Sequence, residues 1–262
     1  ASIDGVPRRT VVEGGIDALK AVWHRGAVDA DGLTGDGAGI LTQIPTNFFD
    51  EEVEKTGHEK REEPLGIGMM FLPRNDYVAL EKCRTIIESE LLDHGYYIYG
   101  WRQVPINNSV IGEKANSTRP EIEQVMFVNN IEREDNFDFS KELYLVRRRL
   151  EKRIAKQQIN GFYVCSLSFE TIIYKGLFLA EQLSIFYPDL ADESFISAYA
   201  LFHQRYSTNT FPSWGLAQPF RMIAHNGEIN TLSANTNWMR NHQTRIASEI
   251  FGDDSEQVKP II

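Results

Sequence analysis

The chain has 262 residues, of which 42% are hydrophobic and 24% are charged, and its formal net charge is −10. This length and composition are typical of a globular protein that can bury a substantial core. The negative charge argues against nucleic acid as a main partner, because phosphate binding needs a basic surface, and no apolar run is long enough to suggest a membrane partner.

In the first quarter of the chain, apolar spacing predicts a helix over 11–24 that ends at Gly26. The residues expected on its inner face are Val12, Ile16, Leu19 and Trp23. A loop rich in glycine and aspartate follows, and then an apolar strand over 40–44. The charged stretch 50–64 is expected to be a solvated surface segment.

The middle of the chain alternates strands and helices. A strand over 65–73 precedes a helix that Asn75 is expected to cap, and another helix begins near Ser140. The inward residues of these two helices are expected to be Leu80, Cys83, Ile87 and Leu91 in the first, and Leu143, Val146, Leu150 and Ile154 in the second. The segments 96–105 and 121–130 lie between the helices and are strand-like.

The last third contains two apolar strands, 162–168 and 171–178, whose short connection predicts a hairpin. A short helix near 179–186, strands over 195–208 and 219–227, and a closing helix from about 230 follow. Links of hairpin length favour antiparallel sheets with helices packed outside them.

The two cysteines, Cys83 and Cys165, are too few for a disulfide framework or a metal cluster. The sequence begins without the apolar region of a signal peptide, so we expect a reducing, cytoplasmic location. Both cysteines lie among apolar residues and are predicted to be core residues, not nucleophiles. The histidines show no ligand spacing, so each is predicted to be structural and no metal site is expected. They are His24, His58, His94, His203, His225 and His242.

Arg205 directly follows an apolar strand and precedes the polar stretch "YSTNT". A guanidinium at a strand end, with Thr208 and Asn209 beside it, could bind a carboxylate through two hydrogen bonds. The alternative is a solvated surface arginine in a polar loop.

Asn226 and Gly227 follow an apolar segment within "IAHNGEIN". The pair could be a hairpin turn, or it could aim a side-chain N–H and a backbone N–H at a developing oxyanion. A capping-rich helical segment follows in place of a matching strand, which weakens the turn interpretation.

The stretch "HRGAVDADGLTGDGAGI" (24–40) contains five glycines. It lacks the Lys-Ser/Thr pair and the strand–loop–helix order of a phosphate-binding loop. We therefore reject nucleotide binding and predict a tight, backbone-dense turn that lets two chain segments approach closely.

Together these segments resemble the N-terminal glutaminase domain of glutamate synthase large subunits, which are class II glutamine amidotransferases. The resemblance covers residues 1–262, including a family-specific insertion at about 65–195, and is greatest to the bacterial NADPH-dependent type. Its principal motifs are "HRGAVDADGLTGDGAGIL", "GYYIYGWRQVPIN", "EKANSTRPEIEQ", "IIYKGLFLAEQL" and "FHQRYSTNTFPSWGLAQPFRMIAHNGEINT". It implies the N-terminal-nucleophile hydrolase fold, an α+β, four-layer α/β/β/α sandwich of two antiparallel sheets.

The resemblance also implies roles for particular residues. Arg205 would bind the α-carboxylate of L-glutamine, with Tyr206, Thr208 and Asn209 around it. Asn226 and Gly227 would form the oxyanion hole, and His225 would precede them. The product ammonia would pass to a synthase domain of the same polypeptide, which aminates 2-oxoglutarate. No cofactor is expected in this domain; FMN and an iron–sulfur cluster belong to the rest of the parent enzyme, which would work with a smaller NADPH-oxidising subunit.

The nucleophile of such enzymes is an N-terminal cysteine, and the resemblance puts that cysteine about six residues before Ala1. We therefore expect the chain as given to be a fragment, without its C-terminal remainder as well, and to lack glutaminase activity. Two alternatives stay open. One is another class II amidotransferase of the glucosamine-phosphate or asparagine synthase type. The other is a non-catalytic glutamine-binding or regulatory module.

Overall fold

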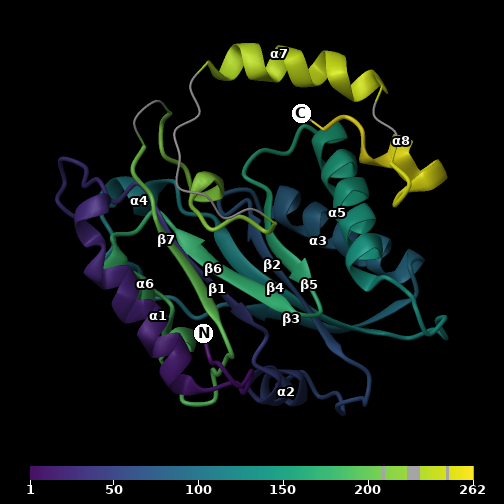
Figure 1. The fold of residues 1–262 in the computed structure, drawn as a ribbon, viewed down its shortest axis with the longest axis horizontal. Helices are drawn as coiled ribbons and strands as arrows, with labels where there is room; N and C mark the ends of the chain where they lie inside the picture. The colour runs from purple at the N-terminus through teal and green to yellow at the C-terminus, as the bar shows by residue number, and fades with distance from the viewer. Residues whose placement is uncertain (208–209, 223–230, 246–247, 262) are drawn as a thin grey trace.

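The computed structural model describes residues 1–207, 210–222, 231–245 and 248–261. Two antiparallel β-sheets lie in the middle of the molecule, with α1 on one outer side and α3 and α5 on the other (Figure 1). Apolar residues from both sheets pack into a shared core, as expected for sheets stacked face to face. The predicted four-layer α/β/β/α sandwich is therefore confirmed.

The first sheet has the order β6–β1–β7, with β1 (Ala38–Gln43) between β6 (Thr171–Gly176) and β7 (Ala200–Gln204). Helix α1 (Arg9–Ala21) covers its outer side and buries Val12, Ile16 and Leu19 as predicted. A Cβ on Gly15 would lie 2.7 Å from the Cβ of Ala200, so glycine lets the helix approach the sheet closely.

The prediction for Trp23 was wrong, because this side chain is 64% exposed. Helix α1 ends at Ala21, and the 3₁₀ turn Trp23–Arg25 follows. The helical spacing that would have turned Trp23 inward therefore stops two residues before it.

The second sheet has the order β3–β4–β2–β5. Its strands are β2 (Leu65–Leu72), β3 (Tyr96–Gln103), β4 (Glu121–Asn129) and β5 (Tyr163–Ser168). Helices α3 (Tyr77–Asp93) and α5 (Phe139–Lys156) bury all eight residues predicted to point inward. The cap of α3 is Asp76, whose Oδ1 accepts from the Ala79 N–H at 2.9 Å, and not Asn75 as predicted.

Alternate residues of the buried strand β2 serve two different cores. Ile67, Met69 and Phe71 belong to the core that includes residues of both sheets, whereas Met70 and Leu72 pack with the residues of α3 and α5. This follows from the two-residue period of a strand that is covered on both faces. The continuous apolar run in "LGIGMMFL" is the sequence signature of that double burial.

Four further predictions were wrong, in whole or in part. Strands β5 and β6 do not form a hairpin, because they belong to different sheets and their short link turns the chain from one sheet to the other. The stretch 50–64 begins inside helix α2 (Thr46–Lys55), which buries Phe48, Phe49 and Val53. Strand β7 is shorter than the predicted 195–208, and the described part of 219–227, residues 219–222, is not a strand.

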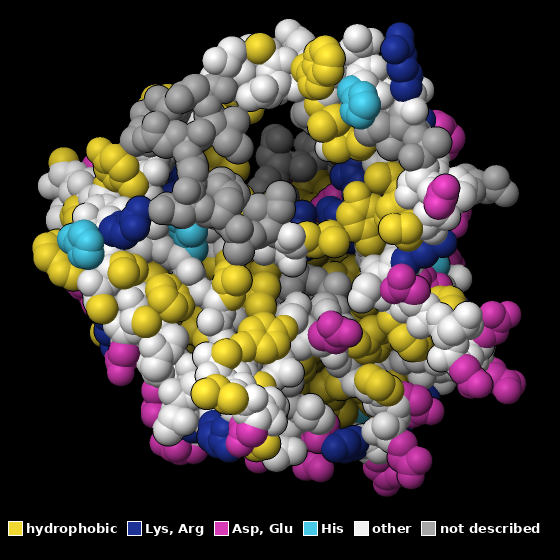
Figure 2. All heavy atoms as spheres, in the orientation of Figure 1, with side chains coloured by type: hydrophobic (Ala, Val, Ile, Leu, Met, Phe, Trp, Pro, Cys, Tyr) yellow, Lys and Arg dark blue, Asp and Glu magenta, His cyan; other side chains and the backbone are white. Residues whose placement is uncertain are grey.

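The remaining elements are short helices and the helices near the C-terminus. The α-helices are α4 (Glu113–Ser117), α6 (Leu183–Phe186), α7 (Leu232–His242) and α8 (Ser255–Val258). The 3₁₀ turns besides Trp23–Arg25 are Asn108–Val110, Ala180–Gln182, Pro188–Ala191, Trp214–Leu216, Gln243–Arg245 and Gly252–Asp254. Helix α7 extends along one end of the molecule, and the face below it is hollowed, with basic side chains in the hollow (Figure 2). Among the described residues, no helix is long and apolar enough to cross a membrane.

Candidate active site

The glycine-rich stretch 24–40 is a tight turn in which chain segments meet backbone to backbone. A Cβ on Gly35 would lie 2.2 Å from the carbonyl oxygen of Phe178, and one on Gly39 would lie 2.5 Å from that of Gln218. Gly37 has a φ of +134°, which side-chain-bearing residues rarely adopt. The prediction of a backbone-dense turn, made in place of a phosphate-binding loop, is confirmed.

We expect Gly35→Ala to lower the free energy of unfolding by about 1–3 kcal/mol, because a backbone carbonyl cannot move aside as a flexible side chain can. Gly14→Ala is the matched control, since Gly14 lies within α1 with open space where a Cβ would be added. That change should stabilise the chain by roughly 0.5–1 kcal/mol. Denaturant unfolding of the two variants checks this, and equal stabilities would contradict the close approach at Gly35.

The same turn holds the segment that follows β7. The Gly37 carbonyl accepts from the Arg205 N–H at 2.7 Å, and Asp36 Oδ2 accepts from the Ser207 N–H at 2.6 Å. The Asp36 carbonyl also accepts from Arg205 Nη1 at 3.3 Å. Asp36 was not predicted as a site residue, because the "GDGAG" stretch was assessed only for phosphate binding and for its backbone. The position of Asp36 between two glycines of a turn could have indicated that it is a site residue.

The guanidinium of Arg205 is half-buried and has neutral partners. Besides the Asp36 carbonyl, it donates from Nη2 to Thr210 Oγ1 at 2.9 Å. Within the described part of the chain, no carboxylate forms an ion pair with it. Burial lowers the pKa of this guanidinium, and the nearby Asp36 charge opposes that shift. An arginine in this environment can bind a carboxylate by donating two hydrogen bonds from its planar guanidinium.

A buried lysine fixes the segment that leads from Arg205 towards residue 223. Lys175 on β6 is 1% exposed, and its Nζ donates to the carbonyls of Gly215 at 2.9 Å and Ala217 at 2.7 Å. Burial lowers the pKa of its ammonium group to about 8. Sequence reasoning missed Lys175, although a single lysine within the apolar run "TIIYKGLF" was a visible signal of a buried, hydrogen-bonded cation.

The structure places only some of the predicted site residues. Arg205 lies directly after β7, and Tyr206 beside it is 64% exposed. The other predicted residues lie outside the described residues: Thr208, Asn209, His225, Asn226 and Gly227. Their roles therefore stay predictions.

Cys83 and Cys165 are both buried, as predicted. Burial raises the pKa of the Cys83 thiol to about 11 and that of Cys165 to about 12, so both stay protonated at neutral pH and are poor nucleophiles. Two of the histidines make the structural contacts expected of them. His94 Nδ1 lies 2.7 Å from the Glu90 carbonyl oxygen, and His58 Nδ1 lies 2.8 Å from Thr56 Oγ1. No group of three possible metal ligands is found among the residues that the structure describes.

Comparison with known proteins identifies the family. The sequence model of class-II glutamine amidotransferases matches residues 1–262. The chain belongs to the class-II glutamine amidotransferases.

The relatives of this class-II amidotransferase chain include much longer proteins. It is 61% identical to the glutamate synthase [NADPH] large chain of Azospirillum brasilense, covering 100% of this chain and 17% of the relative. It is 40% identical to the glutamate synthase [NADPH] large chain of Bacillus subtilis, with 100% and 17% covered. It is 38% identical to ferredoxin-dependent glutamate synthase 1 of Arabidopsis thaliana, with 99% and 16% covered. The chain thus spans less than a fifth of these relatives.

Proposed function

We propose that this chain is the glutaminase part of a glutamate synthase. It would hydrolyse L-glutamine to glutamate and ammonia, and a separate synthase domain of the same polypeptide would use the ammonia to aminate 2-oxoglutarate. The observation that carries the proposal is Arg205, which is half-buried, held by the 36–37 turn and without an ion-pair partner in the described part of the chain. The family membership and the named relatives support the reaction.

In this proposal Arg205 binds the α-carboxylate of glutamine, and Tyr206, Thr208 and Asn209 line that end of the pocket. Asn226 and Gly227 donate to the oxyanion that forms when the amide carbon is attacked, with His225 before them. The attacking group would be the thiol of a cysteine supplied ahead of Ala1 in the parent protein. Its α-amine, with an ordinary pKa of about 7.7–8.0, would take up and return the thiol proton.

The start of the given sequence lies where such a segment could reach Arg205. The Ser2 N–H donates to the Ala198 carbonyl at 2.6 Å, and Ala198 shortly precedes β7. A segment continuing antiparallel along β7 would place a residue about six positions before Ala1 opposite Arg205, since paired positions move in opposite directions.

The wider assembly forms part of the same proposal. FMN and an iron–sulfur cluster would belong to the rest of the parent enzyme, with a smaller NADPH-oxidising subunit. The buried cysteines of this chain do not fit a cluster, because Cys83 packs in the core under α3 and Cys165 in the core shared by the sheets. We also propose that residues at about 65–195 are the family-specific insertion.

Arg205→Gln in the full-length protein tests the assignment. We expect the kcat/KM for glutamine to fall at least about tenfold, mainly through a higher KM, because a charge-assisted hydrogen bond contributes about 1.5–3 kcal/mol. Lys156→Gln is the control, since it removes one exposed positive charge at the end of α5. Activity with ammonia in place of glutamine should be unchanged in both variants. An unaltered KM for glutamine in Arg205→Gln would rule out this role for the arginine.

A further inference from the structure

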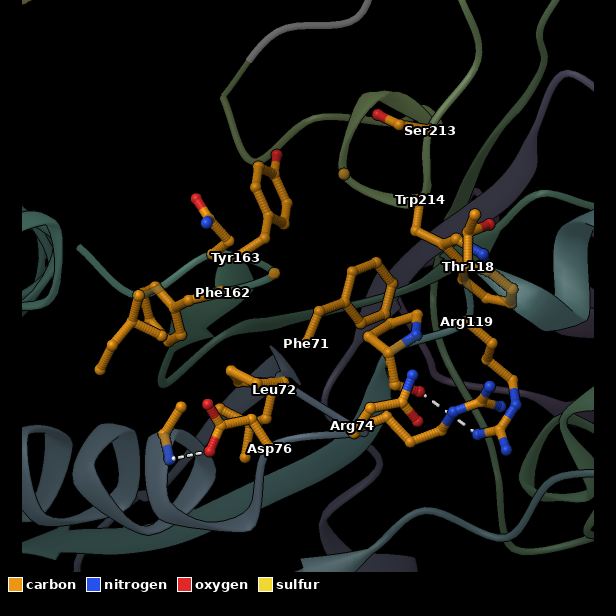
Figure 3. Close-up of a pocket in the computed structure, with 18 of the residues that line it drawn as sticks. Phe71, Leu72, Arg74, Asp76, Thr118, Arg119, Phe162, Tyr163, Ser213 and Trp214 are labelled. Atoms are coloured by element: carbon orange, nitrogen blue, oxygen red, sulfur yellow. Dashed lines mark hydrogen bonds between the residues drawn. The ribbon is translucent and has the colours of Figure 1, made fainter.

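A cavity that lies apart from Arg205 has an excess of positive charge. It has a volume of about 910 Å³ and is formed by four separate stretches of the chain. These are the end of β2 with the start of α3, the link after α4, the link between α5 and β5, and the turn at 212–216. Figure 3 shows Phe71, Phe162, Tyr163 and Trp214 around it and two arginines, Arg74 and Arg119, at one side.

The cations of this cavity outnumber the acidic groups among its described lining residues. Arg74, Lys82 and Arg119 line it, and none of them forms an ion pair within the described part of the chain. Among the described residues that line the cavity, the single carboxylate is that of Asp76, whose Oδ1 accepts a hydrogen bond from the first turn of α3. The cavity therefore has more basic than acidic groups, although the whole chain carries a net charge of −10.

The two arginines are close enough to repel each other. Burial and the charge of Arg74 lower the pKa of the Arg119 guanidinium, while the nearby Glu121 charge opposes that shift. Figure 3 shows the side chains of Arg74 and Arg119 next to each other. Arg119 donates from Nε to Asn116 Oδ1 at 3.4 Å and from Nη1 to the Pro120 carbonyl at 3.2 Å. These partners fix the guanidinium and leave its Nη2 donors available. Two neighbouring guanidinium groups that form no direct ion pair are stabilised when an anion binds between them.

We propose that this cavity binds a small organic anion, with its carboxylate or phosphate group between Arg74 and Arg119. The volume lies within the range of about 300–1,000 Å³ that is usual for small-molecule sites. A single acidic side chain from elsewhere would neutralise the arginines but fill only a fraction of this space. The aromatic lining residues Phe162 and Tyr163, which are only partly buried, would contact the non-polar part of the ligand.

This site does not depend on the proposed glutaminase function. The cavity does adjoin the segment that follows Arg205 in the chain. Ser213, Trp214 and Gly215 of that segment line the cavity, and Lys175 donates to the Gly215 carbonyl. Arg205 is not among the described residues that line it. A failure of anion binding here would therefore leave the Arg205 assignment untouched.

The test is a calorimetric titration of the full-length protein with inorganic phosphate and, separately, with tricarballylate. We expect saturable binding of at least one probe, and the tighter one identifies the preferred acid group. Arg119→Gln and Arg74→Gln should each weaken binding at least about tenfold, the loss of one charge-assisted hydrogen bond. Lys20→Gln on α1, which removes a charge far along the chain from the cavity, should not change the affinity.

Arg119→Lys should give an intermediate affinity, because it keeps the charge and loses the planar fork. Thermal unfolding of each variant establishes that it is folded, and Arg74→Gln provides the test if Arg119→Gln is not. Equal binding by wild type, Arg74→Gln and Arg119→Gln would show adventitious binding elsewhere and overturn the proposal. If neither probe showed saturable binding, the proposal would be overturned too. This outcome is also the one expected if another part of the protein occupies the cavity.

Discussion

An Asn226→Ala substitution in the full-length protein is expected to lower glutaminase turnover roughly 10²–10³-fold, the usual consequence of losing one oxyanion donor. The KM for glutamine should change little, because the amide N–H is needed most when negative charge develops on the substrate oxygen. The reason for choosing Asn226 is its place in "IAHNGEIN" and the family membership of the chain. Steady-state production of glutamate from glutamine, measured over a range of glutamine concentrations, gives both parameters.

Asn108→Ala is the matched control, because Asn108 is an exposed asparagine in a 3₁₀ turn. Its turnover should equal that of the wild type. Ammonia-dependent activity of Asn226→Ala should also be preserved, since the synthase reaction does not need the oxyanion hole. If Asn226→Ala kept wild-type turnover with glutamine, the oxyanion assignment would fail, whatever the outcome for Arg205.

The second large effect concerns the stability of the sandwich. We expect Arg102→Met to lower the free energy of unfolding by about 3–5 kcal/mol, because it leaves a buried carboxylate without its counter-charge. Arg102 on β3 donates to Asp189 from Nη1 at 2.7 Å and from Nη2 at 2.8 Å, and from Nε to Glu52 at 2.6 Å. The side chains of Arg102 and Asp189 are only 9% and 3% exposed.

This ion pair connects the two sheets. The Tyr174 hydroxyl on β6 donates to Asp189 Oδ2 at 2.8 Å and accepts from Gln124 Nε2 on β4 at 2.9 Å. Burial, the Asp189 charge and the hydrogen bond to it hold the pKa of Tyr174 well above its usual range, so the hydroxyl remains a donor. The network therefore joins strands of both sheets to the turn at Pro188–Ala191 through bonds that are out of contact with water.

Denaturant unfolding of Arg102→Met alongside Arg8→Met measures this effect. The Arg8–Asp4 pair is exposed, with side-chain exposures of 45% and 52%, so its loss should change the stability much less. Adding Asp189→Asn to Arg102→Met should recover part of the loss by removing the unpaired charge. Similar losses for Arg102→Met and Arg8→Met would show that the buried pair is not needed to hold the sheets together.

Most secondary-structure elements were predictable, and the errors have physical reasons. The inward faces of α3 and α5 were correct because helical periodicity is a local property of the chain. The hairpin prediction for β5 and β6 failed because a short link can reverse a chain within one sheet or turn it between two. Helix α2 was missed because the charged stretch 50–64 was considered separately from Phe48 and Phe49, which form part of the buried face of the helix.

The sequence by itself determined the chemistry available to this protein: an arginine after an apolar strand, an Asn-Gly pair before a capping-rich helix, and two cysteines among apolar neighbours. These features depend on residue types and short spacings, which are local. Tertiary structure alone decided that the Asp36–Gly37 turn holds Arg205 across a separation of 169 residues, and that Lys175 fixes the segment after it. It also decided that Arg74 and Arg119 meet in one cavity. Such contacts depend on which strands share a sheet and on where glycine lets backbones approach, and no local periodicity encodes either.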